Sequence, residues 1–193
     1  EVFTPGQSFT ARQVLLATGL RERGPDIPSF NEFYGQSIFY CPWCDGYEMR
    51  HRKLAIIYTV ERMAHMVKLL SNFSKDLIVF TNGESVTTED KAWLKAKNID
   101  IYTDFIADLN GENGQLTHIT LANDEKVEVE GGFSQMQWDT HFDFLKNLSL
   151  ERDENEKFEV NAFGETSIKH FYIAGETKDN FAGQIIDAAA NGG

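Results

Sequence analysis

The chain has 193 residues, 41% of them hydrophobic, which is enough for one large domain or two small ones with packed cores. Its 30 acidic and 18 basic side chains give a formal net charge of −12, which argues against nucleic acid or an anionic membrane surface as a partner because phosphates would be repelled. No apolar run approaches the ~18 residues of a membrane-spanning helix. We expect no signal peptide before the first strand and a cytoplasmic location.

Short apolar runs alternate with helical patterns through the first half of the chain. The apolar runs predict buried strands at 10–17, 37–40, 53–58, 76–80 and 99–102, and the helical patterns fall at 61–73 and 87–97. A turn-rich connector at 21–28 holds Gly24, Pro25 and Pro28. The β-α-β-α-β order in the middle of the chain predicts a parallel sheet flanked by helices.

The pattern changes after residue 104. Apolar and polar residues alternate at 105–109, 115–121 and 126–129, which predicts an antiparallel meander laid against the parallel sheet. Gly131-Gly132 is read as a boundary. Beyond it we expect a short helix at 142–148, strands at 158–160 and 171–174, and a helix of small residues at 181–190.

Both cysteines of the chain lie in one stretch, Cys41-Pro42-Trp43-Cys44-Asp45. Two thiols at this spacing can close one small disulfide ring, so they can be oxidised and reduced together. If the turn after Cys41 is helical, its free N–H groups favour a thiolate, and Pro42 suits the first helical position because it has no N–H. The carboxyl group of Asp45 would then donate and accept the proton of the reacting thiol.

Two other interpretations of the pair remain open. A zinc site needs four ligands, and there is no second Cys pair; His51 and His65 would have to complete it at a spacing far too long for a zinc finger. The thiols could also be inert and buried, or form an incidental disulfide. Neither alternative needs an aromatic residue inside the pair or an acid behind it.

Three stretches together resemble the thioredoxin reductase family of flavin-dependent disulfide oxidoreductases. The first is VLLATG at 14–19, similar to the Ala-Thr-Gly strand end that lies near the flavin. The second is CPWCDGYE at 41–48. The third is FYIAGETKDNFAGQIIDAAANGG at 171–193, similar to the C-terminal flavin-binding segment of the family. Their order and spacing also fit, so the resemblance covers essentially the whole chain.

The resemblance implies an α/β fold with two Rossmann-like three-layer (ββα) domains. Residues 1–35 and 136–193 would be pieces of an FAD domain, and 36–135 an inserted NADPH-type domain that carries the dithiol. The GxGxxG segment with which the family begins is absent from the sequence. We therefore expect an N-terminally truncated fragment that is inactive alone and does not retain the FAD of the intact protein.

The family's residue roles carry over position by position. Cys44 would be the sulfur on the flavin side, Cys41 the thiol that attacks the substrate disulfide, and Asp45 the acid and base of the exchange. The expected cofactor-binding residues are Ala17, Thr18, Gly19, Gly175, Glu176 and Gln184. Glu176 stands where the family usually has Asp, and Gly183 replaces an arginine before Gln184, so a charge contact is lost.

The inserted domain departs from the family at its nucleotide-binding turn. After the strand KLAIIY the family has a Gly-rich turn of GxGxxA type, whereas residues 58–64 contain no glycine, and Glu61 adds repulsion at the helix start. Residues 81–84 lack the basic side chains that would contact the 2′-phosphate. We expect this domain to keep its fold and to bind NADPH weakly or not at all.

The sequence thus predicts a thioredoxin reductase-like flavoprotein, in which FAD and a protein or small-molecule disulfide or dithiol exchange electrons through Cys41–Cys44. Because the nucleotide site is eroded, a dithiol oxidase that passes electrons to oxygen is one alternative. A non-enzymatic redox-sensing or binding module is another. No nucleic acid, membrane or metal is expected, and the intact protein would be a homodimer, as is usual in the family.

Overall fold

The computed structural model describes residues 1–139, 142–154, 157–179 and 183–192. They form two compact units, one built from 1–23 together with 138–193 and the other from 24–137. Each unit has a hydrophobic cluster of its own. The assignment of a flavin domain to 1–35 and 136–193, and of an inserted nucleotide-type domain to 36–135, stays a prediction.

A five-stranded parallel sheet forms the centre of the 24–137 unit. Its order is β5–β12–β6–β7–β8, and each pair of neighbours runs parallel. The strands are β5 (Ile38–Phe39), β12 (Gly132–Ser134), β6 (Leu54–Ile57), β7 (Leu77–Phe80) and β8 (Asp100–Tyr102). All residues of β6 and β7 are buried, as expected for strands covered on both faces. The predicted β-α-β-α-β order is confirmed.

Four helices belong to this unit: α1 (Phe30–Phe33), α2 (Pro42–Asp45), α3 (Val60–Leu70) and α4 (Thr88–Lys95). The two longer helices confirm the sequence patterns. The buried residues of α3, Met63, Met66, Val67 and Leu70, follow helical spacing. Thr87 caps α4, since its hydroxyl accepts a hydrogen bond from the N–H of Asp90 at 3.1 Å. The one-turn helix α1 was not predicted.

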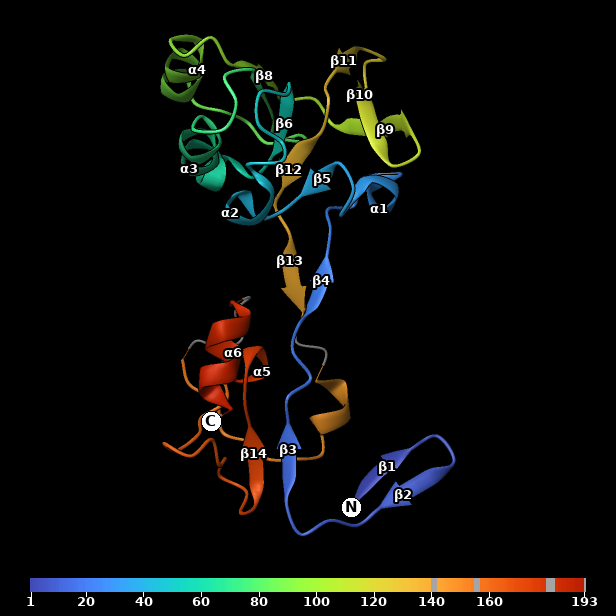
Figure 1. The fold of residues 1–193 in the computed structure, drawn as a ribbon, viewed down its shortest axis with the longest axis vertical. Coiled ribbons are helices and arrows are strands. Elements are labelled where there is room, and N and C mark those ends of the chain that lie inside the picture. The colour runs from blue at the N-terminus through green and yellow to red at the C-terminus, as the bar shows by residue number, and fades with distance from the viewer. Residues whose placement is uncertain (140–141, 155–156, 180–182, 193) are drawn as a thin grey trace. The chain divides into compact units, whose positions relative to one another are not determined.

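The predicted meander forms a separate three-stranded antiparallel sheet of β9 (Ile106–Glu112), β10 (Gln115–Leu121) and β11 (Lys126–Glu128). Figure 1 shows α3 and α4 on one side of the parallel sheet and β9–β11 on the other. The unit therefore has three layers, helix, parallel sheet and antiparallel sheet, which confirms the predicted α/β class.

The interpretation of Gly131-Gly132 as a boundary is wrong. Gly132 opens β12, which lies between β5 and β6 and pairs with Ile38 on one side and Ala55 on the other. A Cβ atom at Gly132 would lie 2.6 Å from the carbonyl oxygen of Ala55. Glycine is present because the two strands approach closely, which is one of the reasons for glycine inside a strand.

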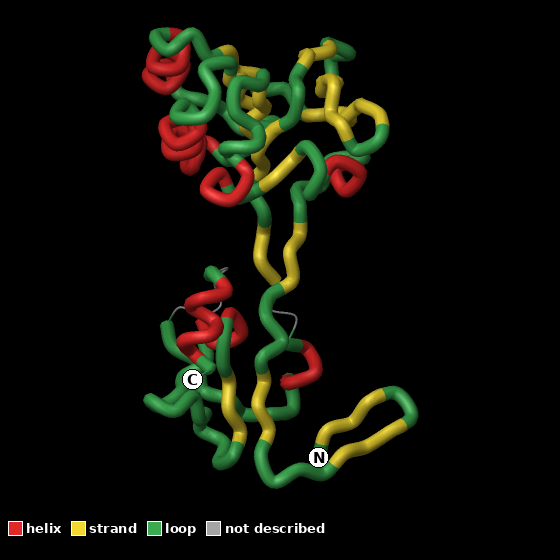
Figure 2. Tube along the Cα trace, viewed as in Figure 1, coloured by secondary structure: helices red, strands yellow, loops and turns green. Residues whose placement is uncertain are grey.

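In its described residues, the other unit contains three pairs of strands. β1 (Val2–Thr4) and β2 (Gln7–Phe9) form a hairpin, β4 (Arg21–Arg23) pairs with β13 (Gln137–Asp139), and β3 (Val14–Leu16) runs parallel to β14 (Phe171–Ile173). The helical segments are the 3₁₀ turn η1 (Asp143–Leu145), α5 (Glu176–Asp179) and α6 (Ile185–Asn191). Much of the rest is loop (Figure 2).

Five predictions for this unit need correction. The buried strand expected at 10–17 is the three-residue β3, in which only Leu16 is buried, and the connector expected at 21–28 begins with the strand β4. The strand expected at 158–160 is wrong, because Phe158 makes only an isolated bridge with Arg152. The helix expected at 142–148 is a single 3₁₀ turn. The helix expected at 181–190 begins at Ile185; residues 181 and 182 lie outside the described part of the chain.

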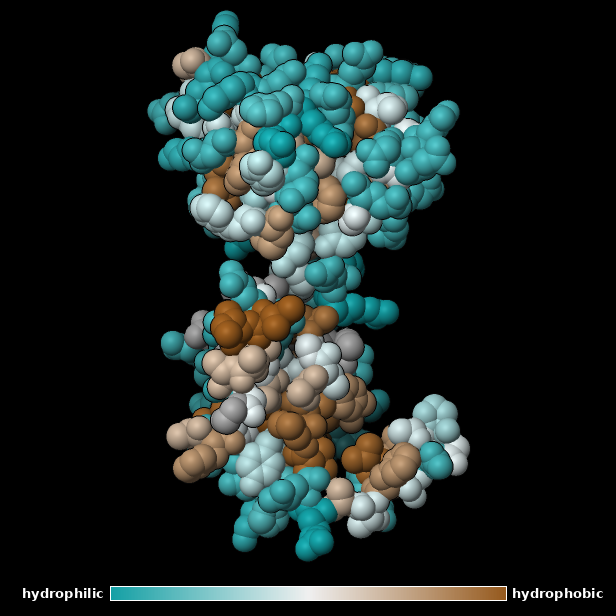
Figure 3. Space-filling model, in the orientation of Figure 1, coloured by the Kyte–Doolittle hydropathy of each residue, from teal (hydrophilic) through white to brown (hydrophobic). Residues whose placement is uncertain are grey.

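The core of this unit is small. Leu16 and Ile173, from the paired strands, pack with Phe142, Leu145 and Phe158. Large hydrophobic side chains also remain exposed, among them Leu15 at 63%, Ile185 at 91% and Ile186 at 69%. Figure 3 shows brown, hydrophobic surface over this unit, whereas the visible face of the 24–137 unit is mostly teal.

Candidate active site

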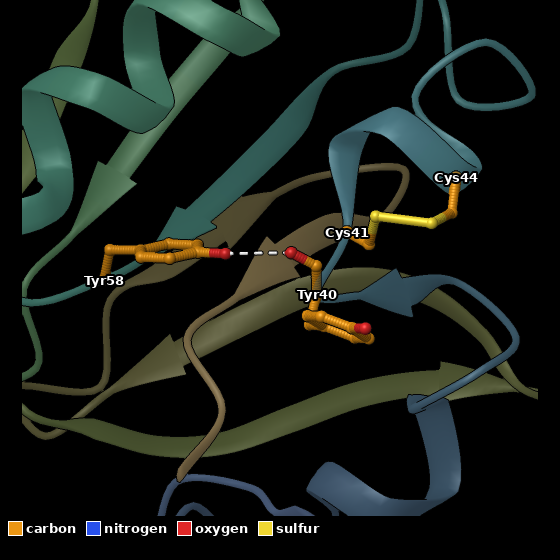
Figure 4. The surroundings of a disulfide bond; sticks show 4 residues. All are labelled: Tyr40, Cys41, Cys44 and Tyr58. Carbon is orange, nitrogen blue, oxygen red and sulfur yellow. Dashed lines mark hydrogen bonds between the residues drawn. A yellow bond between two sulfur atoms is a disulfide. The ribbon is translucent and has the colours of Figure 1, made fainter. Parts of the chain in front are cut away.

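Cys41 and Cys44 are joined by a disulfide in the 24–137 unit (Figure 4). Their Cα atoms are 5.3 Å apart, within the usual range of about 4.4–6.8 Å. The turn after Cys41 is helical, as the thiolate argument requires: Cys41 is the N-cap of α2 and Pro42 occupies the first helical position. The N–H groups of Cys44 and Asp45 both donate to the carbonyl of Cys41, at 3.0 and 3.1 Å.

The disulfide is accessible from solvent. Cys44 is exposed and Cys41 is partly buried. Trp43, between them, is 78% exposed, and Tyr47 in the next turn is 64% exposed. The guanidinium group of Arg50 lies 4.0 Å from the centre of the Tyr47 ring. A disulfide or dithiol substrate can therefore reach the sulfur atoms from a surface that carries two aromatic rings.

Residues 46–49, which follow the disulfide in the chain, are anchored by buried packing contacts. Gly46 is buried, and a Cβ atom there would lie 2.8 Å from the ring of Phe73. Met49 is 3% exposed and belongs to the main hydrophobic cluster of the unit. The cysteine pair thus lies at a one-turn helix that is followed by residues of a packed core, while Cys44 itself is exposed.

Asp45 directly follows Cys44 in α2 and is partly buried. Burial raises the pKa of its carboxyl group, and the negative charge of Glu48 raises that pKa further. A carboxyl group that keeps its proton to higher pH is better suited to protonate a leaving thiolate near neutral pH. The environment of Asp45 is therefore compatible with the predicted acid–base role.

The strand β6 ends beside the dithiol segment. The hydroxyl of Tyr58 donates a hydrogen bond of 3.1 Å to the carbonyl of Tyr40, the residue before Cys41 (Figure 4). Tyr58 begins the turn in which the sequence lacks the glycines of a dinucleotide site. A side chain of this turn is thus used to contact the dithiol segment.

The N-terminus of α3 is closed by side chains of the same unit. The N–H of Val60 donates to a carboxylate oxygen of Glu84 at 2.8 Å. The N–H and hydroxyl of Thr59 both donate to the side-chain oxygen of Gln135, at 3.3 and 2.9 Å. A carboxylate therefore binds the helix end at which dinucleotide-binding folds hold a phosphate group.

Most of the predicted cofactor-binding residues lie around one cavity of the other unit. Its volume is about 350 Å³, and it is lined by Ala17, Gly19, Gly175, Glu176 and Gln184, together with Leu15, Ala174, Gly183, Ile185, Ala188 and Gly192. Thr18, between Ala17 and Gly19, is exposed. The parallel pairing of β3 with β14 brings residues 17–19 close to residues 175–179.

Two glycines in this cavity have backbone conformations that favour glycine. Gly19 has φ +66° and Gly175 has φ +68°, both in the left-handed region. An ideal Cβ atom at either position would meet no atom closer than 3.7 Å. A Cβ atom at either position would make only ordinary van der Waals contacts, so the left-handed backbone, and not crowding, is what favours glycine at these two places in the cavity wall.

Hydrogen bonds join the two segments around the cavity. The N–H of Gly19 donates to the hydroxyl of Thr177 at 2.8 Å, and Thr177 is fully buried. One carboxylate oxygen of Glu176 accepts from the N–H of Gly183 at 3.0 Å. The longer acid at position 176 is therefore accommodated by a backbone contact within its own segment.

The sequence reasoning missed Tyr58, Glu84 and Thr177. The absence of glycine at 58–64 predicts that NADPH binding is lost, but it does not predict that Tyr58 contacts Tyr40. Glu84 and Thr177 lie 24 and 158 residues from their partners. No local pattern signals such contacts, although the position of Thr177 next to the predicted Gly-acid pair was a clue.

The structure bears on the alternative in which the two cysteines bind zinc. The two sulfur atoms bind each other. Across the described ranges, no group of three or more His, Cys, Asp or Glu side chains is arranged to hold a metal ion. In the same part of the chain, every helix is too short or too polar to cross a lipid bilayer.

Comparison with known proteins relates the whole chain to one family. A family model described as pyridine nucleotide-disulphide oxidoreductase matches residues 2–192. The solved structure of TrxB from Bacillus anthracis, which is assigned as a thioredoxin reductase, is 37% identical with a TM-score of 0.89. That match covers 97% of this chain and 63% of TrxB.

Two curated relatives match at lower identity. The thioredoxin reductase SirT of Leptosphaeria maculans is 28% identical over 89% of this chain and 57% of its own length. The thioredoxin reductase AclD of Aspergillus oryzae is 26% identical over 76% of this chain and 49% of its own length. The chain therefore spans less than two thirds of each of these relatives.

Proposed function

The chain belongs to the pyridine nucleotide-disulphide oxidoreductase family, and we propose that it carries the redox dithiol of a thioredoxin reductase-like flavoprotein. Its substrate would be a protein or small-molecule disulfide, or the corresponding dithiol. The observation that supports this best is the accessible Cys41–Cys44 disulfide, fixed on α2 with a partly buried acid beside it. A structural disulfide would have no need of this acid.

The exchange proceeds in two steps. The Cys41 thiolate attacks one sulfur of the substrate disulfide, forms a mixed disulfide and releases one substrate thiolate. The Cys44 thiolate then attacks the sulfur of Cys41, closes the Cys41–Cys44 disulfide and releases the second substrate thiol. Asp45 protonates the leaving thiolate and removes the proton from the attacking thiol. The protein loses two electrons and the substrate gains two.

FAD is the proposed partner of the dithiol in electron transfer. The cavity fits it by its composition, because Gly19 and Gly175 bring backbone without a side chain to its wall, and the carboxylate of Glu176 supplies a hydrogen-bond acceptor. Ala17, Thr18 and Gln184 would complete the contacts. When bound, the flavin supplies or accepts the electron pair of the dithiol. The residues of this unit bind and orient it.

We also propose that the 24–137 unit binds NADPH weakly or not at all. Glu84 places a negative charge on the α3 N-terminus, Gln135 holds Thr59, and Tyr58 fills the start of the turn. Phosphates would have to displace these contacts against electrostatic repulsion. In a calorimetric titration, binding of NADPH to the protein should not saturate at micromolar concentrations of NADPH. A dissociation constant in the low micromolar range would refute the proposal.

The same feature favours a dithiol oxidase as a second candidate. Without a nucleotide donor, electrons would run from a substrate dithiol through Cys41–Cys44 and the flavin to molecular oxygen. Oxygen consumption by the intact, flavin-containing protein on addition of dithiothreitol would support this direction. Reduction of a protein disulfide with a chemical reductant of the flavin, without oxygen uptake, would support the other.

Single-cysteine variants test the proposed roles. The family resemblance assigns substrate attack to Cys41, whereas Cys44 is the more exposed residue in the disulfide. With Cys44→Ser, we expect Cys41 to be trapped as a mixed disulfide with oxidised glutathione, at least about tenfold faster than Cys44 in the Cys41→Ser variant. Mass spectrometry of the adducts gives both rates. A faster reaction at Cys44 would reverse the roles, and rates no higher than that of free cysteine would refute redox function.

A further inference from the structure

Tyr58 connects the end of β6 to the dithiol segment. Its side chain is 7% exposed, and its hydroxyl donates to the carbonyl of Tyr40 at 3.1 Å. Figure 4 shows the ring of Tyr58 directed along this bond, with Cys41 directly after the accepting residue. The bond joins two segments that are 18 residues apart in the sequence.

The ring of Tyr58 belongs to the core around the dithiol. It lies in the same buried cluster as Met49, which follows α2, and Phe133 of β12, and Phe39 of β5 packs against that cluster. The chain on both sides of the cysteines is therefore anchored in the cluster that contains Tyr58. The hydroxyl adds a directional contact one residue from the first sulfur.

We propose that Tyr58 is a positioning residue that stabilises the Cys41–Cys44 disulfide. Dinucleotide-binding folds place glycine at this turn so that phosphates can approach. Here the turn carries a large side chain that holds the dithiol segment. The inference rests on the proposed redox function of the pair. In it, the turn at 58–64, which lacks the glycines of a dinucleotide site, contributes to that redox function through Tyr58.

The Tyr58 hydroxyl is a permanent donor. Burial raises the pKa of Tyr58 well above its ordinary value, and the positive charge of Arg62 opposes that effect only in part. The phenol therefore keeps its proton throughout the pH range in which proteins are folded. The donor is therefore present at any pH in this range, and the hydrogen bond to Tyr40 shifts the redox equilibrium because it forms more fully when the disulfide is closed, the state in which it is observed.

The effect on the disulfide follows from preorganisation. Holding the Tyr40 carbonyl fixes the backbone that carries Cys41 and so keeps its sulfur near that of Cys44. Closing the disulfide then requires less ordering, so the dithiol has a higher effective concentration. Loss of the bond should make the disulfide easier to reduce by two glutathione molecules, with one oxidised glutathione as the other product.

The variant Tyr58→Phe removes only the hydroxyl. We expect the equilibrium constant for closing the disulfide to fall about three- to tenfold, the range that one neutral hydrogen bond provides. The reduction potential becomes less negative by about 14 to 30 mV. The measurement equilibrates the chain with mixtures of reduced and oxidised glutathione and counts free thiols by alkylation and mass spectrometry.

Tyr102→Phe is the matched control. Tyr102 lies on β8, at the opposite edge of the sheet from β5, and its ring stacks on Phe80 at 5.4 Å. The variant loses a hydroxyl in the same unit and should keep the equilibrium constant of the unchanged protein. If Tyr58→Phe lowers thermal stability but matches this control in the redox equilibrium, Tyr58 only packs the core and our inference is overturned.

The same titration separates failure of the inference from failure of the proposed function. A Cys41–Cys44 pair that stays oxidised or stays reduced at every glutathione ratio contradicts the redox function itself. A pair that titrates normally and ignores Tyr58→Phe contradicts only the role of Tyr58. Neither result depends on a bound flavin.

Discussion

Under our proposal, Asp45 donates and accepts the proton in thiol–disulfide exchange. Its surroundings raise the pKa of its carboxyl group. Burial and the charge of Glu48 raise the pKa of its carboxyl group above the ordinary 3.8. The folded chain thus disfavours the ionised form. The free energy of unfolding should therefore decrease as the pH rises from the ordinary pKa to the raised one. A group placed at this cost to folding is a good candidate for function.

Substitution of Asp45 and of Glu48 should have different effects on the exchange rate. Asp45→Asn should slow reduction of oxidised glutathione by the reduced chain about 10- to 100-fold near pH 7, because the proton carrier is lost. Glu48→Gln should lower the pKa of Asp45 and move the corresponding step of the pH–rate profile to lower pH, with a similar plateau.

The measurement is the rate of exchange between about pH 4 and pH 8, a window that begins near the ordinary pKa of a carboxyl group and extends in the direction of the shift. Glu32→Gln is the control, since Glu32 is an exposed acid on α1, outside the dithiol segment. A step that stays at the same pH in Glu48→Gln would show that Asp45 does not control the profile.

Residues that act locally were the ones that the sequence could predict. Cys41 at the N-cap and Pro42 at the first helical position follow from their spacing and from the missing N–H of proline. Tyr58, Glu84 and Thr177 were missed because each acts on a backbone group that is distant in sequence. Their roles exist only once the sheet has formed.

At the scale of elements, strands with an apolar or alternating pattern were predicted, short ones such as β5 and β8 included, whereas β12 was not. β6 and β7 each have four buried residues in a row, and such runs are characteristic of a covered parallel strand. β12 has three residues and begins with Gly132, so its pattern resembles a boundary. The glycine is explained only by the neighbouring strand, which cannot be read from the local sequence.

We expect Gly132→Ala to destabilise the 24–137 unit by about 1–3 kcal/mol, because the new methyl group is forced against the backbone of Ala55. Unfolding in urea, followed by far-ultraviolet circular dichroism, measures the change. Gly192→Ala is the control, since its Cβ atom would meet only ordinary contacts at 3.6 Å or more. Equal stability of the two variants would contradict the close approach of β12 to β6.

At the scale of the whole molecule, the two units differ in how well their cores are filled. The 24–137 unit has buried strands covered on both sides. In the described part of the other unit, the hydrophobic cluster has five buried residues, and Leu15, Ile185 and Ile186 are exposed. Because burial of apolar surface is the main stabilising contribution, the second unit should be the less stable of the two.

Hydrogen exchange should report this difference directly. We expect the amides of β6 and β7 to exchange at least about tenfold more slowly than those of β3 and β14, because the smaller unit opens without unfolding the larger. Peptide-resolved mass spectrometry gives the rates. Equal protection of both strand pairs, with a single unfolding transition, would show that the chain behaves as one cooperative body.

The hydrogen bond between Gly19 and Thr177 spans 158 residues of the chain, and this fixes an order of events on the ribosome. At synthesis rates of roughly 5–20 residues per second, the N-terminal partner waits about 8 to 30 seconds for the C-terminal one to emerge. Residues 24–137 are continuous and can mature during that delay. The glycine-lined cradle is accordingly assembled after the 24–137 unit, and a ribosome that stops before Thr177 leaves the dithiol without it.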